Sequence, residues 1–381
     1  MIQPKFRIAF FGHDSADAAI RRRIQALKHD GINVVGYMMH RRAPGHLDWD
    51  NVDLGETRDG AFLQRFRSIF SGAEMAAKDA DRLSAADIFF ARNLDMLALA
   101  FLVKRKLKLD TPVIYESLDV HRLLSRRDPI GRILRGLEGR LLSRCDALIV
   151  SSPGFLEHHF DRYYPNRFTA HLIENRLAAS ANYGRRARPG VRSAAQPLQV
   201  GWVGMLRCQR SLDLLSQVAD KLGDRVHIHL HGLPARKEIV EFEPVIERRT
   251  NMTYHGEYKS PEGLADIYKG LDIVWAGDFM EAGQNSVWLL PNRIYEGGYY
   301  GVPSVAPGGT QTATWINAHN VGFTVNEPLN ETLPHLIANL AGDRTEISKY
   351  KNNLLSLDDE IFVQPNGFLY NIIRDIVDGA T

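Results

Sequence analysis

The stretch Gln284–Ala306, QNSVWLLPNRIYEGGYYGVPSVA, decides how the rest of the chain is interpreted, because its residue types predict a loop, a short helix and a buried strand in quick succession. Pro291 suits the first turn of a helix, where its missing N–H would have no partner, and Gly301 followed by Pro303 marks the end. The pattern therefore predicts a helix from about Pro291 to Tyr300, followed by a core strand.

The first turn of this predicted helix is suited to hold an anion. Asn292 and Arg293 lie where free backbone N–H groups and the helix dipole attract a phosphate. Glu296 shares a face with Asn292 and is predicted to accept hydrogen bonds from ribose hydroxyls. The pair Gly297 and Gly298 lowers helix propensity by roughly 1 kcal/mol per glycine, which predicts that something approaches this surface closely.

Length and composition bound the class of protein. A chain of 381 residues predicts two domains or slightly more, and 44% hydrophobic with 24% charged residues is typical of a globular protein. No apolar run approaches the roughly 20 residues that span a bilayer, and the N-terminus lacks the organisation of a signal peptide, so a cytoplasmic location is expected. Cys145 and Cys208 are far apart and without metal spacing, which predicts reduced thiols and no zinc site.

The charge is unevenly spread along the chain. Residues 1–180 hold 28 Lys and Arg against 22 Asp and Glu, a balance of +6, which leaves 19 against 23, or −4, for the remainder. Either this is chance, or the first domain faces an anionic partner such as a membrane surface. Nucleic acid is not expected, because the arginines do not alternate with aromatic residues as in a stacking platform.

Apolar runs alternate with helical segments throughout, which predicts α/β domains with parallel sheets covered on both faces. The alternation breaks at 178–197, a basic stretch rich in small residues that is interpreted as a linker, and restarts at Gln199. The predicted domains are 1–180 and 198–360, and a last helix in 361–381 is expected to return towards the first domain. Two doubly wound domains predict a deep cleft between the carboxyl ends of both sheets.

Several segments resemble one family. PNRIYEGGYYGVPSVAP, at 291–307, resembles the donor-binding helix of GT-B glycosyltransferases of glycosyltransferase family 4. VGWVGMLRCQRSLDLL, at 200–215, is similar to the first strand and loop of the family's second domain. SRCDALIVSSPGFLEHHF and LIENRLA resemble late parts of its first domain, at 143–160 and 172–178. Within the family, the chain most resembles bacterial exopolysaccharide enzymes of the succinoglycan type, which extend lipid-linked oligosaccharides.

The resemblance implies a GT-B fold, two Rossmann-like domains, and a sugar-nucleotide site in the second domain. A strand that ends in Gly204 and is followed by Arg207 and Arg210 is also how a phosphate cradle is built. With Arg293, these arginines can neutralise a leaving diphosphate, so neither a metal nor a cofactor is expected.

The chain departs from the family's pattern at Trp288, where many members carry a glutamate. Glu281, Gln284 and Asn285 in the preceding loop are the candidates to replace this acid. The departure leaves the identity of the donor sugar open.

Catalytic groups are expected from the first domain, where Asp119 and His121 follow a predicted strand and His13 follows another. An inverting transfer needs a general base, and any of the three would serve. The resemblance favours a retaining transfer, in which the leaving diphosphate assists. The alternative is that Asp119 caps the next helix and His121 is a surface residue.

The predicted helix Ile130–Arg144 carries leucines and isoleucines on one side, with arginines around them. Such a helix either covers a sheet or lies on anionic lipid, and both interpretations stay open.

The leading hypothesis is a glycosyltransferase, cytoplasmic or peripheral on the inner face of the plasma membrane. It moves a hexose from a nucleotide diphosphate sugar, with UDP-sugar favoured, to a glycan that is free or linked to a polyprenyl diphosphate. The alternatives are an isomerase similar to UDP-GlcNAc 2-epimerases and a non-catalytic protein that binds sugar nucleotides.

Overall fold

The computed structural model describes residues 6–41, 45–57, 62–184, 186, 190, 192–281 and 283–380. It divides the chain into two compact units. Unit 1 comprises Met1–Ile173, Ala178–Ser180 and Pro365–Thr381, and unit 2 comprises Glu174–Leu177 and Ala181–Gln364. The C-terminal segment therefore belongs to the same unit as the N-terminal one.

The described strands of unit 1 form one parallel sheet in the order β3-β2-β1-β4-β5-β6-β7. Buried apolar runs of five or six residues, such as RIAFFG, account for the central strands, since both faces of such a sheet are covered. The strands are β1 (Arg7–Gly12), β2 (Asn33–His40), β3 (Asp50–Glu56), β4 (Ile88–Arg92), β5 (Val113–Ser117), β6 (Ala147–Val150) and β7 (Ala170–Leu172).

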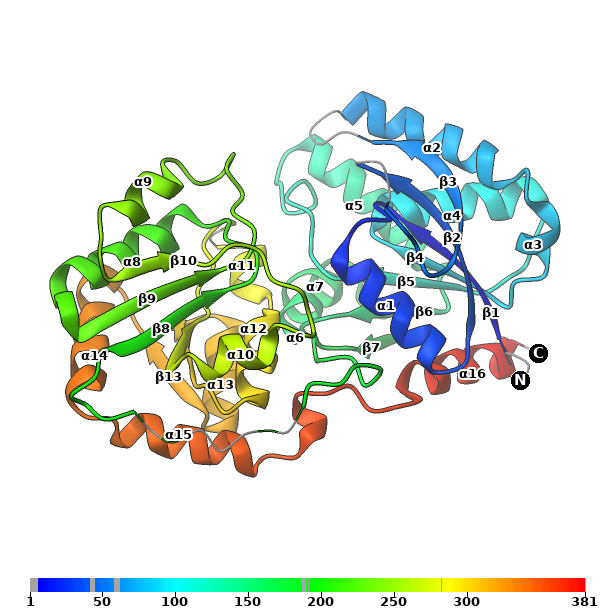
Figure 1. Ribbon diagram of the computed structural model, residues 1–381. Helices are drawn as coiled ribbons and strands as arrows, with labels where there is room; N and C mark the ends of the chain where they lie inside the picture. The colour runs from blue at the N-terminus through cyan, green and yellow to red at the C-terminus, as the bar shows by residue number, and fades with distance from the viewer. Residues whose placement is uncertain are drawn as a thin grey trace. The chain divides into compact units, whose positions relative to one another are not determined.

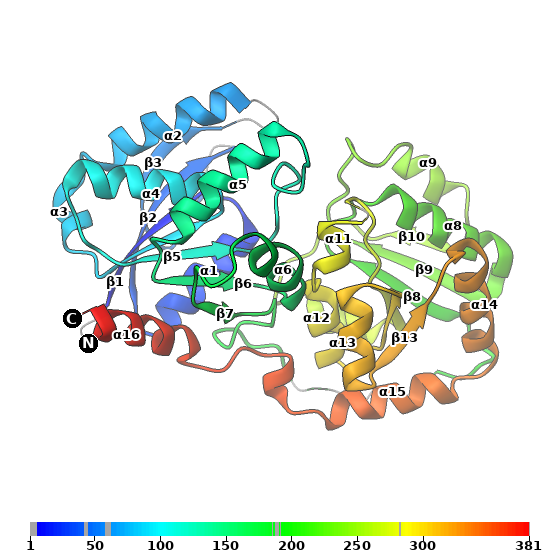
Figure 2. The same cartoon turned by 180° about the vertical axis from the view of Figure 1, so that it is seen from behind.

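Helices cover both faces of this sheet, with α1 and α16 on one face and α2, α4 and α5 on the other (Figures 1 and 2). The C-terminal helix α16 packs in the core of the first face through Leu369, Ile372 and Ile373. The helices of unit 1 are α1 (Ala18–His29), α2 (Phe62–Ala76), α3 (Ala80–Ser84), α4 (Leu94–Leu107), α5 (Pro129–Leu142), α6 (Pro153–Phe155), the π-helical η1 (Leu156–Phe160), α7 (Asp161–Tyr163) and α16 (Phe368–Ala380).

The described strands of unit 2 form a second parallel sheet in the order β10-β9-β8-β11-β12-β13. The strands are β8 (Leu198–Val203), β9 (Val226–His231), β10 (Met252–Tyr254), β11 (Ile273–Trp275), β12 (Ser304–Pro307) and β13 (Gly322–Val325). The helices are α8 (Gln209–Leu222), the 3-10 turn η2 (Gly223–Arg225), α9 (Phe242–Glu247), α10 (Leu264–Lys269), α11 (Asn285–Trp288), α12 (Asn292–Tyr299), α13 (Gln311–His319), α14 (Leu329–Gly342), α15 (Thr345–Ser356) and the 3-10 turn η3 (Asp359–Ile361).

The strand order reverses once in each sheet. In unit 1 the chain runs outward from β1 to β3 and then returns to β4 on the other side of β1, and in unit 2 β8 and β11 are related in the same way. Loops that leave neighbouring strands in opposite directions open a crevice beyond the carboxyl ends of those strands, which is where ligands bind in such sheets. The fold therefore selects one position in each unit for a site.

The helix predicted from about Pro291 to Tyr300 is α12, with Pro291 at its N-cap. The expected close approach at its glycines is made by the protein itself. A Cβ on Gly298 would lie 2.4 Å from the ring of Phe362, and one on Gly297 would lie 3.2 Å from Tyr268. The glycines thus allow other parts of unit 2 to pack on the helix, and the predicted close approach is confirmed, with the protein's own side chains making it.

After its first residues, which belong to unit 1, the stretch interpreted as a linker is tied to unit 2. Residues 185, 187–189 and 191 lie outside the described residues. Arg186 donates to the backbone oxygens of Tyr299 and Leu357, and Arg192 pairs with Asp272. Within the described residues, no helix combines the length and the apolarity that crossing a membrane requires.

Candidate functional site

His13 and Asn93 meet at the switch point of unit 1, one residue beyond the ends of β1 and β4. The side-chain nitrogen Nδ2 of Asn93 lies 3.3 Å from Nδ1 of His13. Asn93 has φ 70° and ψ 161°, a region that is almost confined to glycine and that costs on the order of 1–3 kcal/mol. Its backbone N–H donates to the carbonyl oxygen of Glu116, which helps to hold this conformation. Backbone strain of this kind clusters at functional sites.

The environment of His13 keeps its imidazole neutral. Burial lowers the pKa of His13, and the nearby guanidinium groups of Arg92 and Arg41 lower it further, while Asp17 and Asp95 act in the opposite direction. A neutral imidazole can accept a proton, so His13 meets the chemical requirement for the base that the sequence predicts.

A buried ion cluster lies directly behind this switch point. Glu116 on β5 is fully buried; its Oε1 accepts from Nε of Arg23 at 2.7 Å and its Oε2 accepts from Nε of Arg92 at 2.7 Å. Burial alone would raise the pKa of Glu116, but the two guanidinium groups outweigh it and lower the pKa below the ordinary glutamate value. The cluster joins α1, β4 and β5 beneath Asn93.

Asp119 and His121 lie on the loop that follows β5, and both are exposed. The backbone oxygen of Asp119 accepts from the hydroxyl of Ser117, and Nδ1 of His121 accepts from the backbone N–H of Leu123. No helix follows Asp119 directly, and α5 is capped by Asp128, whose carboxylate accepts from the N–H of Gly131. The alternative role of Asp119 as a helix cap was therefore wrong.

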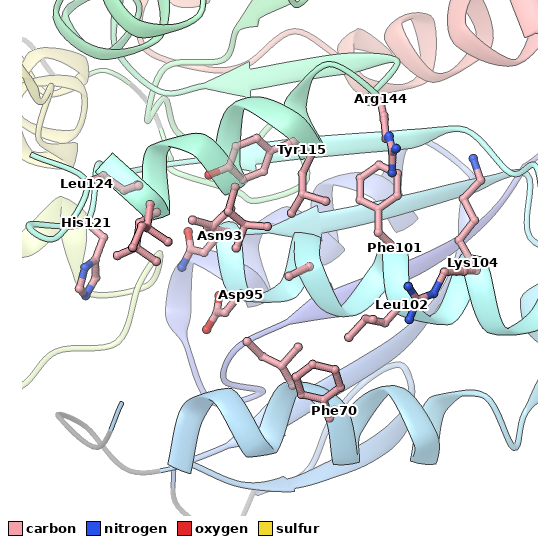
Figure 3. Close-up of a pocket in the computed structure, with 18 of the residues that line it drawn as sticks. Phe70, Asn93, Asp95, Phe101, Leu102, Lys104, Tyr115, His121, Leu124 and Arg144 are labelled. Carbon is pink, nitrogen blue, oxygen red and sulfur yellow. The ribbon is translucent and has the colours of Figure 1, made fainter. Parts of the chain in front are cut away.

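Asp119 and His121 border a pocket of about 1000 Å³ in unit 1, enclosed by α2, α4 and α5 (Figure 3). His121 lies at one end of it, Lys104 and Arg144 at the other, and Phe70 and Phe101 between them. Its apolar lining is Ile69, Phe70, Leu94, Ala98, Phe101, Leu102, Leu109, Tyr115, Leu123, Leu124, Ile133, Leu134, Leu137 and Leu141, and its polar lining is Asn93, Asp95, Lys104, Arg105, Lys108, Asp110, Asp119, His121 and Arg144.

The switch point of unit 2 is organised in the same way as that of unit 1. Gly204 follows β8 with φ 112°, and a side chain there would meet open space. Arg207, three residues on, donates from Nε and Nη2 to Oδ2 of Asp278, at 3.1 and 3.0 Å, and Asp278 lies just beyond β11. Burial opposes ionisation of Asp278, but the charge of Arg207 and further hydrogen bonds lower its pKa.

Arg293, in the first turn of α12, interacts electrostatically with the same carboxylate. Its side chain is buried and donates to the backbone oxygen of Trp275 at 3.3 Å. Burial lowers the pKa of Arg293, while the charge of Asp278 favours its protonated form. Arg207 thus pairs directly with Asp278, and Arg293 adds a second positive charge nearby, at the N-terminus of a helix.

Other predicted residues lie around this centre in different settings. Glu296 is buried and accepts from the hydroxyl of Tyr268 at 2.9 Å. Arg210 pairs with Glu327 at 2.6 Å and lies over the ring of Phe279. The remaining three lie near the start of short helices: Gln284 at the N-cap of α11, and the first helical residues Asn285 and Asn292. Their roles in binding stay predictions, as does that of the partly buried Trp288.

Sequence reasoning missed Asn93, Asp95 and Asp278. Each follows the end of a buried strand, which is a visible signal. Such positions occur after every strand, however, and only the order of strands in the sheet shows that β4 and β11 are the ones at the switch points.

Replacing Glu116 with Gln should destabilise unit 1 by about 3–5 kcal/mol, since it leaves two buried guanidinium groups without their counter-ion. Because the folded pKa of Glu116 lies below the unfolded one, its contribution is present above about pH 4.5 and is lost as the pH falls through the folded pKa. Urea unfolding at pH 7 and at lower pH should show the loss in the wild type and not in the variant. Glu74→Gln breaks an exposed pair with Lys106 and should cost no more than about 1 kcal/mol; equal losses in both variants would contradict the assignment.

No protein-family model matches the chain. It is 35% identical over 350 residues to the succinoglycan biosynthesis protein ExoL of Rhizobium meliloti (strain 1021), covering 89% of this chain and 87% of that protein. Its structure is similar to sucrose-phosphate synthase from Thermosynechococcus elongatus, with a TM-score of 0.72 at 14% identity over 99% of this chain and 100% of the other. It is also similar to Anabaena HepE in complex with UDP-glucose, with a TM-score of 0.70 at 13% identity over 98% of this chain and 99% of the other.

The structural similarity shows the GT-B fold, which confirms the predicted fold class. The extent of the sequence match to ExoL shows the family, and it favours glycosyl transfer over the isomerase and non-catalytic alternatives. The chain therefore belongs to the GT-B glycosyltransferases of exopolysaccharide biosynthesis, in the group that includes the succinoglycan biosynthesis protein ExoL.

Proposed function

We propose that this glycosyltransferase moves a hexose from a UDP-sugar, bound by unit 2, to a glycan carried on a polyprenyl diphosphate, bound by unit 1. The observation that carries the donor half is the ion pair of Arg207 with Asp278 at the switch point of unit 2, with the charge of Arg293 near the same carboxylate. HepE, which has the same fold, forms complexes with UDP and with UDP-glucose, and this supports UDP as the nucleotide.

The arrangement in unit 2 suits a diphosphate for three physical reasons. The carboxylate of Asp278 holds Arg207 in place before any ligand arrives, so that little side-chain entropy is lost on binding. Arginine forms strong, charge-assisted hydrogen bonds with phosphate oxygens. The N-terminus of α12 offers backbone N–H groups to an anion, and the open space in front of Gly204 lets a ligand come close to that loop.

Replacing Arg207 with Gln should weaken binding of UDP about tenfold or more, because one charge-assisted contact to phosphate is lost. Arg207 is about one-third exposed, so the variant is expected to fold. Isothermal titration with UDP measures the effect, and Arg293→Lys should act in the same direction. Arg225→Gln is the matched control, because it removes the same charge just before β9, at the amino end of the strand and away from the switch point. UDP affinity that is unchanged in both Arg207→Gln and Arg293→Lys would refute the donor site.

The pocket of unit 1 supports a lipid-linked acceptor. A free glycan is polar and gains little binding free energy from contact with leucine, isoleucine and phenylalanine side chains. A polyprenyl chain can bury its methyl and methylene groups against them. Lys104, Arg105, Lys108 and Arg144 line the same pocket with Asp110, which gives part of it an excess of positive charge that suits an anionic diphosphate. Asp119 and His121 border the pocket and would contact the hydroxyl groups of the acceptor there.

Replacing Ala98 with Phe should partly fill the pocket without adding charge. We expect KM for a polyprenyl-diphosphate-linked acceptor to rise about tenfold, since a few buried methylene groups are worth roughly 0.8 kcal/mol each. The same variant should leave KM for the lipid-free glycan unchanged. Ala195→Phe, at an exposed position of unit 2, controls for the added bulk. Equal changes in KM for the two acceptors would show that the pocket does not receive the lipid.

Helix α5 supports peripheral binding at the inner face of the plasma membrane. Ile130, Ile133 and Leu137 expose 52%, 71% and 42% of their surface, while Leu142 is fully buried. The exposed arginines Arg132, Arg140 and Arg144 lie on or just after the same helix. Exposed apolar side chains surrounded by cations are typical of a helix that lies in the interface of an anionic bilayer.

The double variant Ile133→Ser and Leu137→Ser should lower binding to vesicles of phosphatidylglycerol at least several-fold, because it removes apolar area that the bilayer would bury. Cosedimentation measures binding, and vesicles of phosphatidylcholine should bind the wild type weakly. Val240→Ser, on unit 2, changes an apolar residue that is also 71% exposed and should have no effect. Wild-type binding that does not depend on lipid charge, or on these two residues, would contradict the proposal.

A further inference from the structure

Unit 2 carries a cluster of histidines that the proposed reaction does not use. The sequence of β9, VHIHLH, alternates apolar residues with histidines, so the apolar side chains enter the core and all three histidines share the opposite face of the sheet. His255 follows β10, which lies beside β9 (Figure 1), and its backbone N–H donates to the carbonyl oxygen of Leu230 on β9. Four imidazoles thus gather on one face of the sheet: His227, His229, His231 and His255.

Three of these side chains converge. His229, His231 and His255 each offer a ring nitrogen, and the three nitrogens lie within 4.8 Å of one another. Nδ1 of His229 is 2.9 Å from Nε2 of His255. The rings of His231 and His255 are parallel to within 4°, with their centroids 4.2 Å apart.

Gln199 on β8 orients the first of these ligands. Its Oε1 lies 2.6 Å from Nε2 of His229, and an amide oxygen can only accept, so Nε2 carries the proton. The lone pair of Nδ1 is then left to point towards His255. A hydrogen-bond acceptor that fixes the tautomer of a histidine in this way is the usual outer partner of a metal ligand.

We propose that His229, His231 and His255 bind one divalent transition-metal ion, with Zn²⁺ as the representative ion. Imidazole nitrogen suits Zn²⁺, Cu²⁺ and Ni²⁺, whereas Mg²⁺ and Ca²⁺ take oxygen ligands. Three histidines leave one tetrahedral position for water. The inference does not depend on the function proposed above.

The side chains need only a small adjustment to hold the ion. Zn–N distances of about 2.0–2.1 Å place the nitrogens of a tetrahedral site about 3.4 Å apart, so the widest separation has to close by at most about 1.4 Å. Rotation about χ2 of histidine is soft, and His255 is exposed, so the stacked rings of His231 and His255 can turn their nitrogens inward.

The imidazole rings of the cluster are uncharged at neutral pH. Burial lowers the pKa of His229 to about 3 and that of His231 to about 4, and neighbouring imidazoles add to both effects. Metal ligation requires the unprotonated ring, so no proton has to be displaced from an imidazolium at neutral pH. The nearby cation Arg192 is paired with Asp272 at 2.8 Å, which offsets its repulsion of an incoming ion.

An ion at this position would join β9 to the segment that follows β10, at the edge of the sheet. The carbonyl oxygen of His231 accepts from the backbone N–H of Gly204 at 3.0 Å, and Gly232 donates to Gly256 at 2.8 Å. The expected effect of the ion is therefore to stiffen the strand end that supports the Gly204 loop.

Tag-free, chelator-treated protein should bind Zn²⁺ at one equivalent in isothermal titration, and Mg²⁺ should give no heat under the same conditions. X-ray absorption of the zinc complex should show three imidazole nitrogens at about 2.0 Å. His229→Gln and His255→Gln should each abolish this binding, and Gln199→Leu should weaken it about tenfold or more through loss of the orienting bond. Circular dichroism of each variant establishes that it is folded.

Two controls separate this site from other zinc ligands. His335→Gln removes an exposed histidine outside the cluster, and Cys145→Ser removes the partly exposed thiol; both should leave zinc affinity unchanged. Absence of Zn²⁺ binding by the wild type would overturn the proposal. Binding that survives in folded His229→Gln and His255→Gln protein, or that is lost in Cys145→Ser, would also overturn it.

Discussion

The reversal of strand order in each parallel sheet is the constraint on which the rest of this structure depends. Loops leaving β1 and β4 in unit 1, and β8 and β11 in unit 2, diverge and leave room beyond the strand ends. In both units that room is bordered by a pair of polar side chains from the two diverging loops: His13 with Asn93, and Arg207 with Asp278. The same topological rule therefore brings a neutral imidazole next to an amide in one unit and a guanidinium next to a carboxylate in the other.

Buried charge supports both positions, but in different ways. In unit 1 the carboxylate of Glu116 is satisfied by two arginines behind the site, and the backbone oxygen of Glu116 accepts from the N–H of Asn93. In unit 2 the carboxylate of Asp278 offsets the positive charge of the arginines that are proposed to bind the donor diphosphate. A buried ion pair contributes little net stability, because desolvation offsets attraction, but it fixes geometry.

Unit 1 combines this polar edge with a long apolar pocket, and the combination suits an enzyme of exopolysaccharide biosynthesis. Helix α4, about 21 Å long, lines the pocket from Leu94 at its first turn to Lys104 and Arg105 at its last. The pocket would have room for a polar group at one end and for a hydrocarbon chain alongside the helix. The arginines of α5 and its exposed isoleucines extend the same chemistry to the surface. The histidine cluster of unit 2 differs from these features, because it brings together neutral ring nitrogens that are proposed to bind a metal ion.

The sequence by itself determined the two α/β domains, the family, and the residues that follow β1, β5 and β8, because buried strands, glycine turns and helix starts are local patterns that can be read along the chain. It did not determine which strands are neighbours, so Asn93, Asp95 and Asp278 remained indistinguishable from any polar residue after a strand. It predicted a close approach at Gly297 and Gly298 but did not show that Tyr268 and Phe362, which lie far away in sequence, make it. It also did not decide whether α5 packs in the core or lies at the surface. Only the tertiary structure decided these points, because the burial of a side chain and the pairing of a charge depend on which distant segments the fold brings into contact.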